Sequence, residues 1–136
     1  MITVDTNILA RAFLNDEPKQ SGLARRFLEK AAQNGQRIFI PQMVVMEFIW
    51  LLKTRKWERA SVATTLDHLL HNHDYQVGNN GVLERALQLY KKGKAEFADY
   101  VIYAESLAKP SATLISFDTQ LQKEFPDFIL KPEALR

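Results

Sequence analysis

The sequence predicts an α/β fold, with a mainly parallel sheet of four or five strands between two layers of helices. Short apolar segments of strand length alternate along the chain with longer segments whose apolar residues recur at helical spacing. Connections between consecutive parallel strands are right-handed crossovers, so this alternation favours a parallel sheet covered on both faces. No repeat, low-complexity stretch or linker divides the 136 residues, and we expect a single domain over residues 1–136.

The first strand is expected at residues 2–4, which are apolar and end at an aspartate. Residues 6–14 follow as a helix, because their apolar side chains recur every three or four positions. A second helix is expected over residues 19–33, with the same spacing. It ends at Asn34 and Gly35, a pair that typically stops a helix.

A second strand is expected at residues 37–40. Pro41 then suits the first turn of a helix, which continues through an apolar segment to Leu52. Residues 60–70 are expected to form another helix, and a turn-prone stretch leads to a brief strand at residues 75–77.

The C-terminal part repeats the alternation of helices and strands. Helices are expected over residues 82–92 and 95–108, the first after an Asn-Asn-Gly turn and the second ending before a proline. A strand at residues 113–116, a short helix at residues 118–123 and a last strand at residues 128–130 complete the chain.

The composition excludes several classes of protein. The chain has no cysteine, so it has neither disulfides nor thiolate metal sites. Its N-terminus lacks the features of a signal peptide, and its longest apolar run, residues 43–52, is too short to span a bilayer. We therefore expect a cytoplasmic protein with no membrane partner. The net charge of +2 does not by itself indicate a nucleic-acid binder.

Two aspartates follow apolar strands. Asp5 comes directly after the first strand, and Asp118 lies two residues beyond the strand at residues 113–116. Carboxyl ends of parallel strands are where open α/β folds bind their ligands. Each aspartate also precedes a helix, so each also suits the role of an N-cap.

Two further acids lie inside apolar helices. The helix that holds Glu47 is apolar nearly all round, including Trp50, so we expect it to be buried, with its carboxylate facing a cation, a hydrogen-bonding cage or a cleft. Asp99 has similarly apolar neighbours. Four such acids favour a hard divalent cation, Mg²⁺ or Mn²⁺, because these ions take oxygen ligands. A site of this kind suits phosphodiester hydrolysis.

These motifs resemble those of the PIN-domain ribonucleases. They are Asp5-Thr6-Asn7 after the first strand, Glu47 in mid-helix, Phe97-Ala98-Asp99, and Ser116-Phe117-Asp118 after a late strand. The chain length and the very early aspartate make the sequence most similar to the VapC-type toxins of toxin–antitoxin pairs. The resemblance covers essentially the whole chain.

The resemblance implies a three-layer PIN-like fold and Mg²⁺- or Mn²⁺-dependent endonucleolytic cleavage of RNA. Asp5, Glu47, Asp99 and Asp118 match the acidic quartet of the family. Thr6, Asn7 and Ser116 match the small polar residues that orient those acids, although many relatives have threonine in place of Ser116. The family also implies a homodimer and inhibition by a cognate antitoxin.

The basic residues are concentrated in two clusters. One consists of Lys53, Arg55, Lys56 and Arg59, and the other lies at residues 91–94. Such lysines and arginines also occur at helix ends as ordinary solvated charges. If they contact RNA, they bind its phosphate backbone, and we regard the first cluster as the candidate RNA-binding surface.

Two other functions share parts of this sequence pattern. An aspartyl-phosphate phosphotransferase of the haloacid-dehalogenase type also has an aspartate after strand one, but it needs a second aspartate where this chain has Asn7. A PIN-like module that binds RNA or protein without cutting typically lacks one or more of the acids. All four acids are present, which favours the nuclease.

Overall fold

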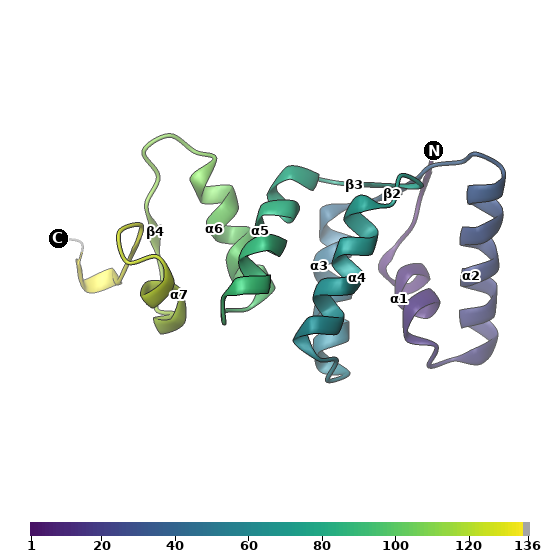
Figure 1. Cartoon of the computed structure of the whole chain (residues 1–136), viewed down its shortest axis with the longest axis horizontal. Coiled ribbons are helices and arrows are strands. Elements are labelled where there is room, and N and C mark those ends of the chain that lie inside the picture. The colour runs from purple at the N-terminus through teal and green to yellow at the C-terminus, as the bar shows by residue number, and fades with distance from the viewer. Residues whose placement is uncertain (135–136) are drawn as a thin grey trace. The chain divides into compact units, whose positions relative to one another are not determined.

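The computed structural model describes residues 1–134, and the last two residues of the expected domain, 135–136, lie outside this part. The chain divides into two compact units, Met1–Asn80 and Gly81–Arg136. In chain order, the elements of the described residues are β1 (Ile2–Thr3), α1 (Thr6–Leu14), α2 (Pro18–Gln33), β2 (Ile38–Ile40), α3 (Gln42–Thr54), α4 (Arg59–His71), β3 (Tyr75–Val77), α5 (Asn80–Lys92), α6 (Phe97–Leu107), β4 (Leu114–Ile115), α7 (Thr119–Glu124), β5 (Ile129–Leu130) and a 3₁₀ helix at Pro132–Ala134 (Figure 1).

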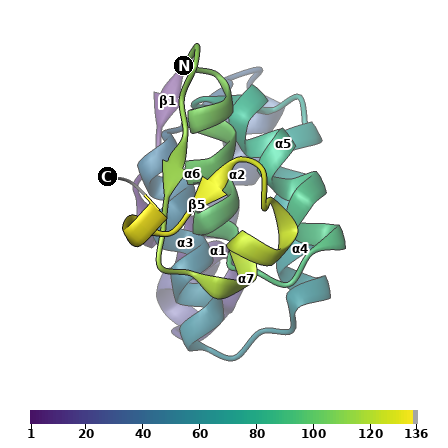
Figure 2. The same ribbon diagram turned by 90° about the vertical axis from the view of Figure 1, so that its left-hand side faces the viewer.

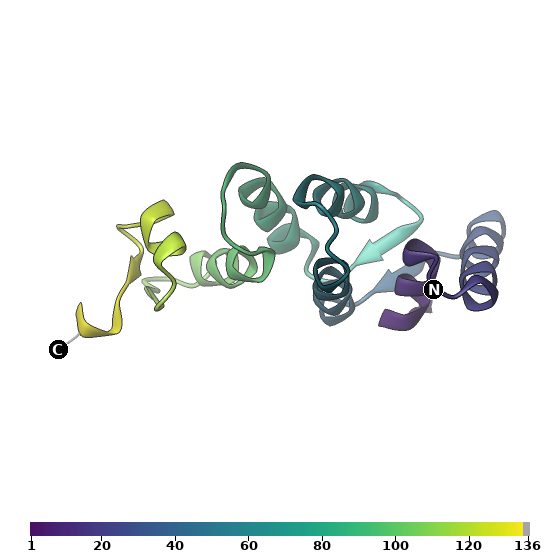
Figure 3. The same ribbon diagram turned by 90° about the horizontal axis from the view of Figure 1, so that it is seen from below.

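The first unit contains a parallel sheet with the strand order β1-β2-β3. Ile2 pairs with Ile38, and Ile38 pairs with Tyr75 on the other side (Figure 3 shows β2 and β3 side by side). The apolar strand residues enter the core of this unit, where Ile38 and Ile40 are almost completely buried. Within this unit, each crossover between parallel strands contains two helices, as the alternation in the sequence predicts.

Helices α1 and α2 pack side by side at one end of this unit (Figure 1). Helix α2 ends where the sequence predicts, because Asn34 is its C-cap and Gly35 follows with a φ of 70°, a conformation that favours glycine. The ring of Phe13 from α1 lies 5.5 Å from that of Phe48 in α3. Helix α1 is therefore tied to α3 by aromatic packing.

Helix α3 has a buried and an exposed face. Its buried residues recur at helical spacing: Val44, Val45, Phe48, Ile49 and Leu52. The opposite face exposes Glu47 and also Trp50, whose side chain is 64% exposed. The expectation that Glu47 and Trp50 are buried is therefore wrong. An apolar run alone did not reveal that only one stripe of the helix enters the core.

The second unit contains helices α5, α6 and α7 and a small parallel sheet formed by β4 and β5 (Figure 2). Leu114 pairs with Ile129, and Ile115 with Leu130. Stacked rings of Tyr103 and Phe125, 3.9 Å apart, join α6 to the end of α7. Tyr100 is fully buried beside them and contacts Phe125 edge-on.

The α/β class and the parallel pairing are confirmed. The strands form a three-stranded and a two-stranded sheet among the described residues, where the sequence predicted one sheet of four or five. Strand pairing over long sequence separations depends on contacts that local patterns do not contain. The expectation that residues 1–136 act as one domain stays a prediction. No helix among the described residues is long and apolar enough to cross a membrane.

Candidate functional site

Asp5 lies between β1 and α1, at the carboxyl end of its strand. Its Oδ1 accepts a hydrogen bond from the amide of Ile8 at 3.1 Å, so Asp5 is the N-cap of α1. The side chain is exposed, and the described residues offer its Oδ2 no hydrogen-bond partner. The cap therefore engages one carboxylate oxygen and leaves the other for a ligand.

Glu47 lines a hollow of about 480 Å³ on the first unit. Thr6 and Asn7, from the start of α1, line it with Glu47, and Met46, Trp50 and Leu51 supply apolar walls. Asn7 also lines a second hollow of about 650 Å³, together with Asp5 and Arg11. Within this unit, Asn7 thus borders both the hollow of Glu47 and that of Asp5.

Asp118 repeats in the second unit the local geometry of Asp5. It is the N-cap of α7, and its Oδ1 accepts a hydrogen bond from the amide of Leu121 at 2.8 Å. The amide of Asp118 itself donates to the hydroxyl of Ser116 at 3.0 Å. Ser116 also accepts, through its carbonyl oxygen, a hydrogen bond from the side chain of Gln122 at 2.7 Å. These bonds fix the turn between β4 and α7.

Asp99 lies in the first turn of α6, where an acidic side chain is stabilised by the positive end of the helix dipole. Its side chain is partly exposed, whereas Phe97 and Tyr100 on either side are buried. The helix therefore anchors its first turn in the core and holds Asp99 at the surface of the second unit.

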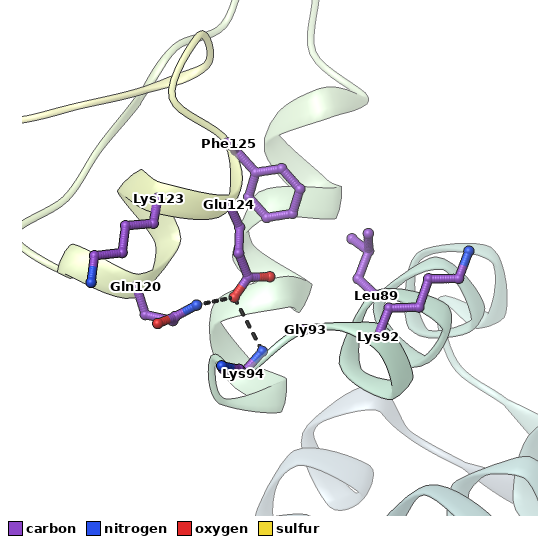
Figure 4. Close-up of a pocket in the computed structure, with 8 residues that line it drawn as sticks. All are labelled: Leu89, Lys92, Gly93, Lys94, Gln120, Lys123, Glu124 and Phe125. Atoms are coloured by element: carbon purple, nitrogen blue, oxygen red, sulfur yellow. Dashed lines mark hydrogen bonds between the residues drawn. The ribbon is translucent and has the colours of Figure 1, made fainter.

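The structure reveals a hydrogen-bonded carboxylate that the sequence did not indicate. Glu124, at the end of α7, accepts from the hydroxyl of Tyr100 at 2.6 Å through Oε1. Its Oε2 accepts from the side chain of Gln120 at 2.8 Å and from the amide of Lys94 at 3.1 Å (Figure 4). Tyr100 and Glu124 are 24 residues apart in the chain, so no local pattern shows that they meet.

These contacts determine the charge state of Glu124. Partial burial acts to raise the pKa of its carboxyl, but hydrogen bonds from Tyr100, Gln120 and the amides of Lys94 and Ala95 outweigh it and hold the pKa below its ordinary value of 4.5. Glu124 is therefore ionised at neutral pH. Because both of its oxygens accept hydrogen bonds, Glu124 joins α7 to α6 and to the loop before α6.

The donor set of the four candidate acids suits a hard cation. Asp5, Glu47, Asp99 and Asp118 each supply carboxylate oxygens, and Mg²⁺ and Mn²⁺ prefer such ligands. In the first unit, Thr6 and Asn7 add a hydroxyl and an amide oxygen beside Glu47. Asp5 and Glu47 belong to the first unit, and Asp99 and Asp118 to the second. Within residues 1–134, no three acidic or histidine side chains form a group that could hold a metal ion. The complete quartet therefore stays a prediction.

The basic candidates lie at the end of α3 and the start of α4. Lys53, Arg55 and Lys56 are exposed, and Arg59 is partly exposed. Arg55 forms an ion pair with Asp16 at 2.7 Å, and Arg11 contacts the same carboxylate at 2.9 Å. The hydrogen bond from Arg55 is the largest influence on Asp16, and with that from Arg11 it lowers the pKa of this aspartate. Arg55 is thus partly neutralised, whereas Lys56 has no such partner among the described residues.

A family model for the PIN domain matches residues 2–125. The chain belongs to the PIN-domain family. The match covers all four acids, and it confirms the resemblance inferred from the motifs.

This PIN-domain protein is also similar to a curated relative, the VapC ribonuclease of Aquifex aeolicus (strain VF5). The two are 25% identical over 124 residues, which cover 90% of this chain and 91% of the relative. No solved structure matches this PIN-domain protein.

Proposed function

We propose that this PIN-domain protein is a metal-dependent endoribonuclease that hydrolyses RNA phosphodiester bonds. The observation that carries the proposal is the PIN-domain match over residues 2–125, a range that includes the four acids that the resemblance assigns to the family's quartet. Similarity to a VapC ribonuclease along nearly the whole chain supports RNA as the substrate.

In this proposal, Asp5, Glu47, Asp99 and Asp118 act together as the ligands of a Mg²⁺ or Mn²⁺ site. Such an ion, when bound by these carboxylates, would supply Lewis-acid activation of a water molecule and positive charge to offset the charge that develops on the phosphate. Asp5 and Asp118 are each held by a backbone amide, from Ile8 and Leu121 respectively, which restricts the orientation of their carboxylates.

Small polar residues support these acids. Ser116 accepts a hydrogen bond from the amide of Asp118 and so fixes the start of α7. Thr6 and Asn7 line the hollow of Glu47, where the amide and hydroxyl groups are available to orient its carboxylate. We assign the binding of the RNA backbone to Lys53, Arg55, Lys56 and Arg59, and we expect Lys56 to contribute more than Arg55 because Asp16 offsets the charge of Arg55.

We further propose that the protein is the toxin component of a toxin–antitoxin pair, with an antitoxin and a second copy of itself as partners. This part of the proposal rests on the resemblance to VapC-type proteins and on the similarity to a VapC ribonuclease. The hollow beside Asp5 is bordered by the exposed apolar side chains of Leu23 and Phe27. A protein seated there would cover the first of the candidate acids.

The test is cleavage of a mixed RNA pool, including folded transfer RNA, by purified protein with Mg²⁺ or Mn²⁺ and with EDTA. Asp99→Asn is compared with Asp127→Asn, a matched change of an exposed aspartate in the same unit that has no proposed role. Cleavage that is lost with EDTA and with Asp99→Asn but kept by Asp127→Asn supports the nuclease. An absence of both cleavage and Mn²⁺ binding contradicts it and favours a PIN-like module that binds RNA or protein without cutting.

A further inference from the structure

A buried hydroxyl joins three segments of the second unit. Tyr100 is fully buried, and its hydroxyl donates to Glu124 Oε1 at 2.6 Å and accepts from the amide of Ala95 at 3.0 Å. Tyr100 belongs to α6, Glu124 to α7 and Ala95 to the connection between α5 and α6. One side chain thus fixes the loop before α6, helix α6 and the end of α7 against one another.

Glu124 makes further hydrogen bonds to the same segments. Its second oxygen binds the amide of Lys94 in the loop and the side chain of Gln120 in α7, and all three residues line a cavity of about 490 Å³ (Figure 4). The loop passes so close to this pair that a Cβ at Gly93 would overlap Tyr100 Oη and Glu124 Oε1. The backbone at residue 93 therefore approaches the hydrogen bond at a distance that only glycine permits.

Tyr100 and Glu124 lie on the two helices that hold the candidate acids of the second unit. Asp99 directly precedes Tyr100 in the first turn of α6. Asp118 caps the start of α7, and Glu124 is the last residue of this six-residue helix. Because α7 has only six residues, a contact that holds Glu124 at its end also restrains Asp118 at its start, in addition to the bonds of Ser116.

We propose that Tyr100 and Glu124 are positioning residues that fix Asp118 of α7 relative to Asp99 of α6. The inference rests on the proposed function, in which both aspartates bind the metal ion. The pair itself touches neither metal nor RNA. Asp99 and Asp118 belong to different helices, and the pair holds their carboxylates at a constant separation.

The experiment compares Tyr100→Phe and Glu124→Gln with Tyr103→Phe. Tyr103 lies on the same helix and stacks on Phe125, but its hydroxyl has no hydrogen-bond partner among the described residues. Two readouts are measured on the full chain: Mn²⁺ affinity, and hydrogen exchange of the Leu121 amide, which is bonded to Asp118. Glu124→Gln preserves the shape of the side chain and serves if Tyr100→Phe folds poorly.

We expect both variants to speed exchange of the Leu121 amide about tenfold relative to Tyr103→Phe, and to weaken Mn²⁺ binding about tenfold or more. Exchange and Mn²⁺ affinity equal to those of Tyr103→Phe would overturn the inference. If Asp99→Asn leaves Mn²⁺ binding unchanged, the proposed function fails, and the exchange of Leu121 still decides whether Tyr100 and Glu124 position Asp118.

Discussion

The carboxylate of Asp5 accepts a hydrogen bond from the amide of Ile8 at 3.1 Å, so the first proposed metal ligand is also the N-cap of α1. Asp118 has the same relation to Leu121 in the second unit. The two roles make different demands on the side chain. Capping needs one hydrogen-bond acceptor, whereas a metal ligand needs the negative charge.

Substitution of Asp5 therefore separates the two roles. Asparagine caps a helix about as well as aspartate, so Asp5→Asn is expected to unfold at nearly the same temperature as the unsubstituted protein while losing RNA cleavage. Asp5→Ala is expected to lose cleavage and also about 0.5–2 kcal/mol of stability. Thermal unfolding and cleavage of one RNA substrate measure both effects. Full cleavage by Asp5→Asn would show that Asp5 is only a cap.

The ion pair between Arg55 and Asp16 predicts unequal effects of two basic residues on RNA binding. Lys56→Gln is expected to weaken binding and to lower the slope of log K against log salt by about 0.7–0.9, the value for one lost phosphate contact. Arg55→Gln is expected to change both quantities less, because Asp16 already offsets its charge. Binding to a catalytically inactive variant, measured over a range of salt concentrations, checks this. Equal effects of the two substitutions would argue against it.

The lowered pKa of Glu124 predicts a pH-dependent stability. Its folded pKa lies below the ordinary value of 4.5, so the unfolded chain binds the proton first as the pH falls. The stabilisation is complete above the unfolded pKa and is lost as the pH drops through the folded pKa. Unfolding by urea between about pH 6 and pH 3 is expected to show a smaller loss of stability for Glu124→Gln than for the unsubstituted protein. If the free energy of unfolding falls equally with pH in Glu124→Gln and in the unsubstituted protein, the prediction is contradicted.

Two glycines of the second unit predict opposite effects of the same substitution. Gly93→Ala is expected to destabilise the protein, because the added Cβ overlaps Tyr100 and Glu124. Gly81→Ala places a Cβ in open space within helix α5 and is expected to be neutral or stabilising by up to about 1 kcal/mol. Thermal unfolding of the two variants measures the difference. A Gly93→Ala variant as stable as Gly81→Ala would show that the loop around residue 93 shifts at little cost to accommodate the added Cβ.

Local patterns predicted most of the fold. The helix α1 at Thr6–Leu14 and the strand β3 at Tyr75–Val77 lie at the residues expected, because apolar spacing and turn residues determine such elements locally. The division of the strands into two sheets was not predicted, and neither was the 3₁₀ helix at Pro132–Ala134. Strand partners are chosen by packing between distant segments, which a single sequence does not display.

For the residues of the candidate site, the sequence indicated local positions and not contacts with distant segments. Asp5 and Asp118 lie after strands and cap helices, as their sequence positions indicated. Glu47 is exposed, although its neighbours in the sequence are apolar, and two of these neighbours, Met43 and Trp50, are exposed as well. The bond between Tyr100 and Glu124 joins two helices and had no local signal.

The proposed function requires Asp5 and Asp118 to act together in binding the metal ion on which RNA cleavage depends. The most direct measurement is the rate of Mn²⁺-dependent RNA cleavage by Asp5→Asn, Asp118→Asn and the double variant. Ligands of one site act as a unit, so each single substitution is expected to lower the rate by about 100-fold or more, and the double variant no further. A full rate in either single variant, or single losses that multiply in the double variant, would contradict the claim.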